Sequence, residues 1–239
     1  MVIETPADIQ TIAWEGELVA PESLKDFAFK KMAGTVRPVV TLGRPEIWPV
    51  AEALEPQLGK SWVPPLSNAA FWLLRLACTL HPVGRFHEIV EAQQTLSLTP
   101  LQPGAPVTST YAFSLFPERL TAEEQREMNL TLGPKLKFGD ISVEGGQAGT
   151  RISYRQVFPV IQGYGAGEPE VYWLFKPHRV YPLAGCQFVY AVVAAQTGAG
   201  GIRGAVELTV SVDTDFGIIR LGLPREARAD LGFTIRPQA

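Results

Sequence analysis

Two stretches of the chain alternate between apolar and polar residues with a period of two. In the segment VEAQQTLSL, which begins at Val90, apolar side chains fall on one side, at Val90, Ala92, Leu96 and Leu98. The other side holds Glu91, Gln93, Thr95 and Ser97. The segment VELTVSVD, residues 206–213, alternates in the same way. Because successive side chains of a β-strand point to opposite faces, both segments are predicted to be half-buried strands.

A third stretch is apolar on nearly every side. Prolines 64, 65 and 82 bracket it, and Ser67 or Asn68 is suited to cap a helix at its start. A helix that is hydrophobic all round is buried by other elements. We therefore expect a central buried helix at residues 67–80. Arg75 is its one charged residue, and we expect it to reach the surface along its own stem or to meet a carboxylate.

Shorter helices are predicted at residues 21–34 and 119–130, with at most two helical turns in the proline-interrupted segment 44–59. Beyond residue 86, strands dominate. Residues 141–161 resemble a hairpin, the glycine-rich turn after it leads into the apolar strand 171–175, and FGIIRLG after the DTD turn completes a meander.

These patterns together predict an α+β fold. A strand-rich antiparallel sheet or β-sandwich, at about residues 86–239, would pack on a helical N-terminal segment that contains the central buried helix at 67–80. We expect a single domain over residues 1–239. The Pro- and Gly-containing segment 99–109 leaves open a subdivision into a helical or mixed part, 1–100, and a β-rich part, 107–239.

Composition narrows the function classes. A hydrophobic content of 46% is that of a folded protein, and a formal net charge of −3 gives no overall attraction to nucleic acid or anionic membranes. The start MVIETPADIQ lacks the basic and apolar regions of a secretory signal, and the longest apolar run is too short to span a bilayer. With two cysteines, Cys78 and Cys186, we expect reduced buried thiols and a cytoplasmic protein without membrane contact.

Four glycines between residues 198 and 204 raise the possibility of a phosphate-binding loop. Such a loop needs the positive end of a following helix. Here the glycines precede the alternating segment 206–213, so the backbone past them is expected to be extended and to form a hairpin with the preceding strand-like segment. Arg203 is the residue that keeps an anion-binding turn open as an alternative.

Candidate metal and nucleophile pairs are weak. His87 and Glu91 resemble the start of a zinc-protease motif, but a third ligand would have to come from His81 or His178. Cys78 and His81 could form a thiolate–imidazole pair, although apolar neighbours should raise the pKa of the Cys78 thiol and keep it inert. We assign no catalytic residue, no metal ligand and no cofactor.

Basic residues are frequent in the central part of the chain. If they converge, they would form a nucleic-acid-binding surface with the aromatic neighbours Tyr172, Trp173 and Tyr181 able to stack on bases. The residues in question are Lys135, Lys137, Arg151, Arg155, Lys176, His178, Arg179 and Arg203. The alternative is that these side chains solvate the outer face of a sheet.

The leading functional hypothesis is a non-catalytic binding or assembly protein that acts through protein–protein contacts, with a protein partner or a homo-oligomer expected. A nucleic-acid-binding subunit that uses the basic surface is the first alternative. A metal-dependent hydrolase built on His87 and Glu91 is the second. Whether the chain is an enzyme is left open, with a non-enzyme favoured by the lack of a catalytic motif.

Overall fold

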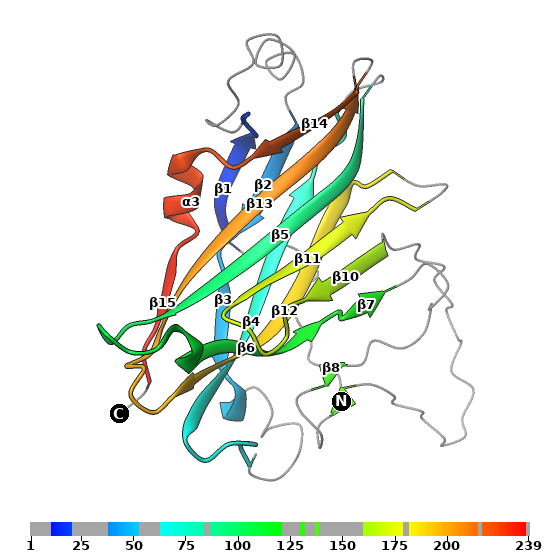
Figure 1. Cartoon of the computed structure of the whole chain (residues 1–239). Coiled ribbons are helices and arrows are strands. Elements are labelled where there is room, and N and C mark those ends of the chain that lie inside the picture. Colours follow the sequence, from blue (N-terminus) through cyan, green and yellow to red (C-terminus); the bar gives the residue numbers. More distant parts are fainter. Residues whose placement is uncertain are drawn as a thin grey trace, which may run out of the picture.

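The computed structural model describes residues 11–20, 38–52, 63–83, 87–120, 130–131, 137–138, 160–178, 182–214 and 217–237. In this part of the chain the fold is almost entirely antiparallel β-structure, arranged as two sheets (Figure 1). A short 3-10 turn, η1 (Val107–Ser109), and a helix, α3 (Arg225–Asp230), accompany the strands. None of the described helices is long and apolar enough to cross a membrane.

The six-stranded sheet has the order β1-β2-β4-β12-β6, with β3 paired to β4. Its strands are β1 (Ile12–Glu17), β2 (Val39–Gly43), β3 (Glu46–Pro49), β4 (Ala69–Leu80), β6 (Thr110–Phe116) and β12 (Gly185–Gln196). The longest pairing joins β4 to β12 along their whole length, from Gln196↔Ala69 to Gly185↔Leu80.

The seven-stranded sheet has the order β14-β13-β5-β11-β10-β7, with β15 paired to β13. Its strands are β5 (Glu88–Pro100), β7 (Arg119–Leu120), β10 (Val160–Tyr164), β11 (Glu170–Lys176), β13 (Ile202–Thr214), β14 (Gly217–Gly222) and β15 (Phe233–Ile235). Two short strands, β8 (Leu130–Thr131) and β9 (Lys137–Phe138), pair with each other.

The two sheets pack face to face around one main core (Figure 1). Alternate residues of β5 and β13 supply the core from one sheet, among them Leu96 and Val210. Residues of β4 and β12, such as Leu74 and Val193, supply it from the other. The predicted strands at 90–98 and 206–213 are therefore confirmed, with one difference in which residues face the core. The pairing of β5 with β13 shifts register beside Val90, so Ile89 lies in the core and Val90, which was placed on the apolar side, does not.

The predicted α+β fold is wrong, and the predicted central helix at residues 67–80 is strand β4. Both faces of this strand are buried: Leu74 lies in the main core, and Leu73 lies in a second apolar cluster on the other side of the sheet. A strand covered on both faces is apolar at successive positions, as a buried helix is. The run of apolar residues that indicated a helix hydrophobic on every side therefore also fits a strand that is buried on both faces.

The remaining predictions of short helices and of one hairpin are only partly covered by the described residues. In the segment 44–59, residues Glu46–Pro49 form β3, which pairs with β4 through Ile47↔Leu74, and residues 50–52 are helical. The helix expected at 21–34 lies outside the described residues, as do residues 121–129 of the helix expected at 119–130. Most of the hairpin expected at 141–161 also lies outside them.

The glycine segment joins the two sheets. Residues 197–201 connect β12 of the six-stranded sheet to β13 of the seven-stranded sheet, so the predicted hairpin between these strands is wrong. The predicted extended backbone after the glycines is confirmed. Gly201 has φ +119°, and a Cβ there would collide with the carbonyl oxygen of Ile235, so the corner requires glycine. The hairpin between β13 and β14 is confirmed.

Arg75 is buried on β4, with 1% of its side chain exposed. Its Nη2 donates to Oε1 of Glu46 at 2.6 Å, and its guanidinium lies 5.0 Å from the ring centre of Phe188. Of the two expectations for this residue, the meeting with a carboxylate is confirmed. The ion pair joins β3 to β4, because Glu46 and Arg75 are directly opposite each other in the register.

Candidate binding face on the seven-stranded sheet

The outer face of the seven-stranded sheet carries the polar and aromatic residues that alternate with its core residues. Along β11, Val171, Trp173 and Phe175 are fully buried, whereas Tyr172 and Leu174 point to the other side and are half-buried. We use the name tyrosine face for the outward side chains around Tyr172. They are Gln93, Thr95, Ser97, Arg119, Gln162, Tyr164, Glu170, Tyr172 and Leu174.

Two tyrosines stack at the centre of this face. Tyr164 and Tyr172 are directly opposite each other on β10 and β11, with ring centres 4.9 Å apart and planes 21° from parallel. The hydroxyl of Tyr164 donates to Oε1 of Gln162 at 2.7 Å. Tyr164 keeps 39% of its surface exposed. Stacked rings of this kind gain about 0.5–1.5 kcal/mol beyond their burial, so they form a rigid aromatic platform.

The turn between β10 and β11 sets this register. Gly165 has φ +89°, and a Cβ there would lie 2.7 Å from the carbonyl oxygen of Glu170. A side chain at this position would therefore both strain the backbone and clash with the strand that follows. The tight turn places Tyr164 and Tyr172, one on each side of it, opposite each other.

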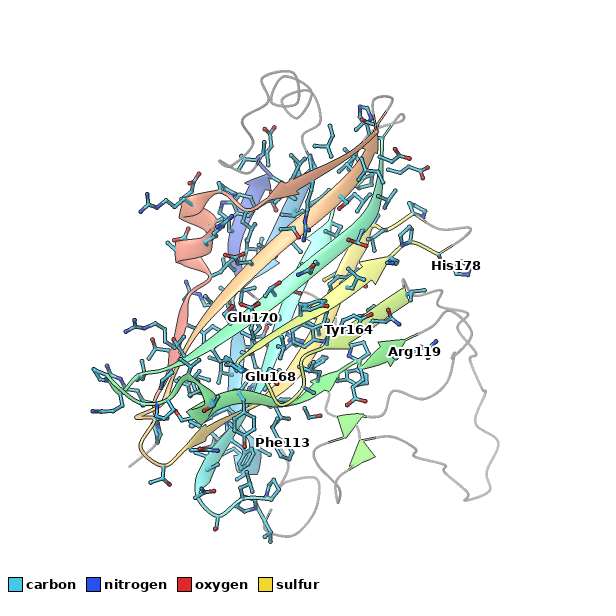
Figure 2. The ribbon with its side chains drawn as sticks, in the orientation of Figure 1. Phe113, Arg119, Tyr164, Glu168, Glu170 and His178 are labelled. Carbon is cyan, nitrogen blue, oxygen red and sulfur yellow. The ribbon has the colours of Figure 1, made fainter. Side chains whose placement is uncertain are left out.

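Hydrogen bonds fix the polar side chains beside the platform. Nε2 of Gln93 donates to Thr95 Oγ1 at 3.1 Å, and Ser97 Oγ donates to Glu170 Oε2 at 3.3 Å. Farther across the sheet, Arg220 on β14 donates to Oε1 of Gln93 at 3.3 Å. The face therefore presents an aromatic centre with donors and acceptors held in place around it. Figure 2 shows Arg119, Tyr164 and Glu170 on this side of the sheet.

No family model matches the sequence, and a comparison with the curated proteins found no match. The solved structure of Clostridium perfringens delta-toxin is similar at 7% identity and a TM-score of 0.39, over 80% of this chain and 90% of that chain. A structure described as a pore forming protein has 10% identity and a TM-score of 0.37, over 87% and 85%. The membrane inserted form of the C. perfringens NetB toxin has 12% identity and a TM-score of 0.36, over 87% and 90%. Likenesses this remote assign neither a family nor a function.

Of the residues predicted for nucleic-acid binding, those with described side chains do not lie together on one surface. Lys176 and Arg203 both point outward from the seven-stranded sheet. Lys176 contacts Glu91 at 3.9 Å, and Arg203 is opposite Thr99, so they lie eight positions of β5 apart, or about 26 Å. His178 lies two residues past the end of β11 and is half-buried (Figure 2). Lys135, Arg151, Arg155 and Arg179 lie outside the described residues, and of Lys137 the structure describes the backbone.

The metal hypothesis finds no support in the geometry that is described. Glu91 lies on β5, and His87 directly precedes the strand, so their Cα atoms are about 13 Å apart in extended chain. Glu91 is paired with Lys176 instead. Across the described residues, no group of three or more His, Cys, Asp or Glu side chains could hold a metal ion.

The proposed thiolate–imidazole pair is replaced by other contacts. His81 Nε2 lies 2.8 Å from Thr41 Oγ1, which donates its proton to Glu15 Oε2 at 2.7 Å, so the ring nitrogen is the donor to Thr41. Cys78 is completely buried, and burial, with a smaller contribution from Cys186, raises the pKa of its thiol to about 12. The burial of Cys78 and the expected rise in the pKa of its thiol are borne out, and its inertness stays a prediction. Cys186 was also expected to be buried, but it is exposed, and neither residue is in a disulfide.

This difference predicts selective thiol chemistry. In the folded protein at pH about 8, Ellman's reagent is expected to modify Cys186 and to leave Cys78 unmodified, because thiolate is the reactive form. The measurement is the released thionitrobenzoate, with one equivalent expected before denaturation and two in urea. Cys186→Ser is the control and should abolish the fast equivalent. Two fast equivalents in the folded protein would contradict the burial of Cys78.

The sequence reasoning missed most of the tyrosine face. Tyr164 was passed over, although the signal was present: Tyr164 and Tyr172 each lie four residues from Glu168, in the glycine-containing turn. A hairpin closed by that turn brings them together. Arg119 and Gln93 had no such signal, because their place beside the tyrosines depends on the order of strands in the sheet.

Proposed function

We propose that this protein is a non-catalytic binding or assembly protein that contacts a protein partner through the tyrosine face. The observation that carries the proposal is the stacked pair of Tyr164, which is exposed, and Tyr172, which is half-buried, on the outer face of the sheet among hydrogen-bonded polar side chains. Tyrosine and arginine are enriched at protein interfaces, and tyrosine supplies a large contact area with little loss of conformational freedom.

The tyrosine face is smaller than a whole standard interface. β11 has seven residues, which gives a length of about 23 Å, and the four strands from β5 to β7 span about 14 Å. The face would therefore be the centre of a contact that extends onto neighbouring surface, since a standard interface has roughly 800 Å² per partner. The nucleic-acid and hydrolase alternatives stay predictions from the sequence, as does a cytoplasmic location.

The test is capture of a partner with a matched set of variants. Tagged wild-type protein, the double variant Tyr164→Ala with Tyr172→Ala, and Val107→Ala are used to capture binding proteins from the source cell. Val107 is a control because it is 54% exposed but lies in η1, outside the tyrosine face. Partners that bind wild type and Val107→Ala are expected to be lost from the tyrosine variant, with at least about tenfold weaker binding when the isolated partner is titrated.

Light scattering on the purified protein separates two kinds of partner. Self-association that the tyrosine substitutions abolish would identify a second copy of this chain as the partner. A monomeric wild-type protein that captures the same proteins as the tyrosine variant would refute the proposal, because binding would then use some other surface.

A further inference from the structure

A pocket of about 560 Å³ opens where the seven-stranded sheet meets the C-terminal helix. One wall is β14 with the turn that follows it, a second is α3, and a third is the segment after β1. Val19 and Gly222 hold the walls together, since each backbone N–H donates to the other residue's carbonyl oxygen at 2.9 Å. The volume lies within the range of small-molecule binding sites.

Among the described residues, three arginines line this pocket and no acidic side chain does. Arg225 and Arg228 are three residues apart on α3 and therefore project from the same side of the helix. Arg220 reaches the pocket from the outer face of β14. The positive charges thus come from two separate elements that converge on one cavity.

The contacts of the arginines leave two positive charges without a contacting carboxylate in the described part of the chain. Arg228 is balanced by Glu207 at 3.5 Å, and its Nε donates to the carbonyl oxygen of Leu223 at 3.2 Å. Arg220 donates to neutral acceptors, Thr209 Oγ1 at 3.1 Å and Gln93 Oε1. Arg225 contacts no described acceptor. These guanidinium groups are therefore available to an anion.

Apart from Thr209 and Gly222, the other described lining residues are apolar, with Val19, Leu221, Leu223 and Pro224 among them. An occupant that matches both parts has an anionic head and a small apolar body. Two uncompensated guanidinium groups match the charge of a phosphate monoester, which is about −1.5 to −2 at neutral pH, better than that of a carboxylate. Guanidinium groups also present paired donors that suit phosphate oxygens.

We propose that this pocket binds a small organic phosphate monoester, with Arg220 and Arg225 on the phosphate and the apolar wall on the organic body. This site adjoins the tyrosine face through the hydrogen bond from Arg220 to Gln93, but the inference does not depend on the proposed protein partner. Gly222 borders the cavity: a Cβ there would lie 3.7 Å from Thr209 Cγ2 and 3.9 Å from Arg228 Nη2, without a clash. A larger side chain at this position would project between those two residues and occupy part of the pocket.

The experiment is calorimetric titration of the full chain with phenyl phosphate at low salt. Phenyl phosphate is expected to bind at least about tenfold more tightly than benzoate, inorganic phosphate or phenol, each of which lacks one part of the match. Arg225→Gln and Arg220→Gln are each expected to weaken binding about tenfold or more, the loss typical of one charge-assisted hydrogen bond. Gly222→Val should abolish binding without a change of charge.

Arg203→Gln is the matched control. Arg203 is an exposed arginine on β13 that points to the outer face of the seven-stranded sheet, as Arg220 does, but it does not line the pocket. Circular dichroism confirms that each variant is folded, and Arg225→Gln is the safest of them because residue 225 is exposed at the start of α3. Vesicles that contain phosphatidic acid show whether a lipid can supply the same phosphate group. Equal binding by wild type and Arg225→Gln, or no binding of phenyl phosphate at millimolar concentration, would overturn the proposal.

Discussion

Replacement of Glu46 with glutamine is expected to destabilise the protein by about 3 kcal/mol. The substitution removes the carboxylate that lies 2.6 Å from Nη2 of Arg75, and Arg75 has 1% of its side chain exposed. Glutamine keeps the size of the side chain and the possibility of one hydrogen bond, so the main loss is the compensating charge. A buried charge that loses its partner is costly because it cannot regain water. Urea denaturation followed by circular dichroism measures the change in the free energy of unfolding.

Two further variants separate charge burial from simple loss of a contact. Glu207→Gln breaks the ion pair with Arg228. The side chains of Glu207 and Arg228 are 51% and 49% exposed, so the substitution is expected to change stability by less than about 1 kcal/mol. The double variant Glu46→Met with Arg75→Met removes both charges and should recover most of the loss, because apolar side chains of similar volume replace a buried pair at little cost. If Glu46→Gln costs no more than Glu207→Gln, Arg75 is not buried as described.

Arg75 also shows why the fold class was mispredicted. A single charge in an apolar stretch fits a helix whose arginine extends to the surface, and the bracketing prolines fit helix ends. The chain instead places Arg75 opposite Glu46, a residue 29 positions earlier on β3. Local periodicity contains no information on a strand partner so far away. The contact that accommodates Arg75 on β4 could therefore not be predicted from one segment at a time.

The segments that were predicted well are those buried on one face. β5 and β13 alternate because the opposite side of each is the polar outer face of the seven-stranded sheet. β4 and β12 have apolar residues on both faces, since Leu73 and Val192 pack in the second cluster while Leu74 and Val193 pack in the main core. Alternation is a signal of half burial, so it disappears in the most central strands of the molecule.

The two candidate sites also differ in whether they depend on local or distant parts of the sequence. The tyrosine pair depends on one turn, Gly165 to Glu170, and could be predicted from the sequence around it. The arginine-lined pocket depends on a bridge between Val19 and Gly222, about two hundred residues apart in the chain. The first kind of site is local and the second is not, which is why sequence reasoning reached Tyr172 but none of the arginines of the pocket.

Substitution of Trp173 with alanine is expected to cost about 3–5 kcal/mol of stability. Trp173 is fully buried and lies opposite Gln94 of β5 in the register of the two strands. Its removal leaves a cavity in the main core that the packed sheets cannot close. Urea denaturation gives the loss, and the m-value should not change if the folded state keeps its compactness.

Two comparisons make this result specific. Nε1 of Trp173 and Oε1 of Gln94 are buried, and neither has a hydrogen-bond partner in the described part of the chain. Trp173→Phe removes the unpaired indole N–H and keeps a large aromatic ring, so it should lower the free energy of unfolding far less than Trp173→Ala does. Tyr172→Ala, one residue away on the outer face, should also cost much less, because that side chain is half-buried. A similar loss at residues 172 and 173 would contradict the alternation of β11, and with it the separation between a core that sets stability and a tyrosine face that is free to bind.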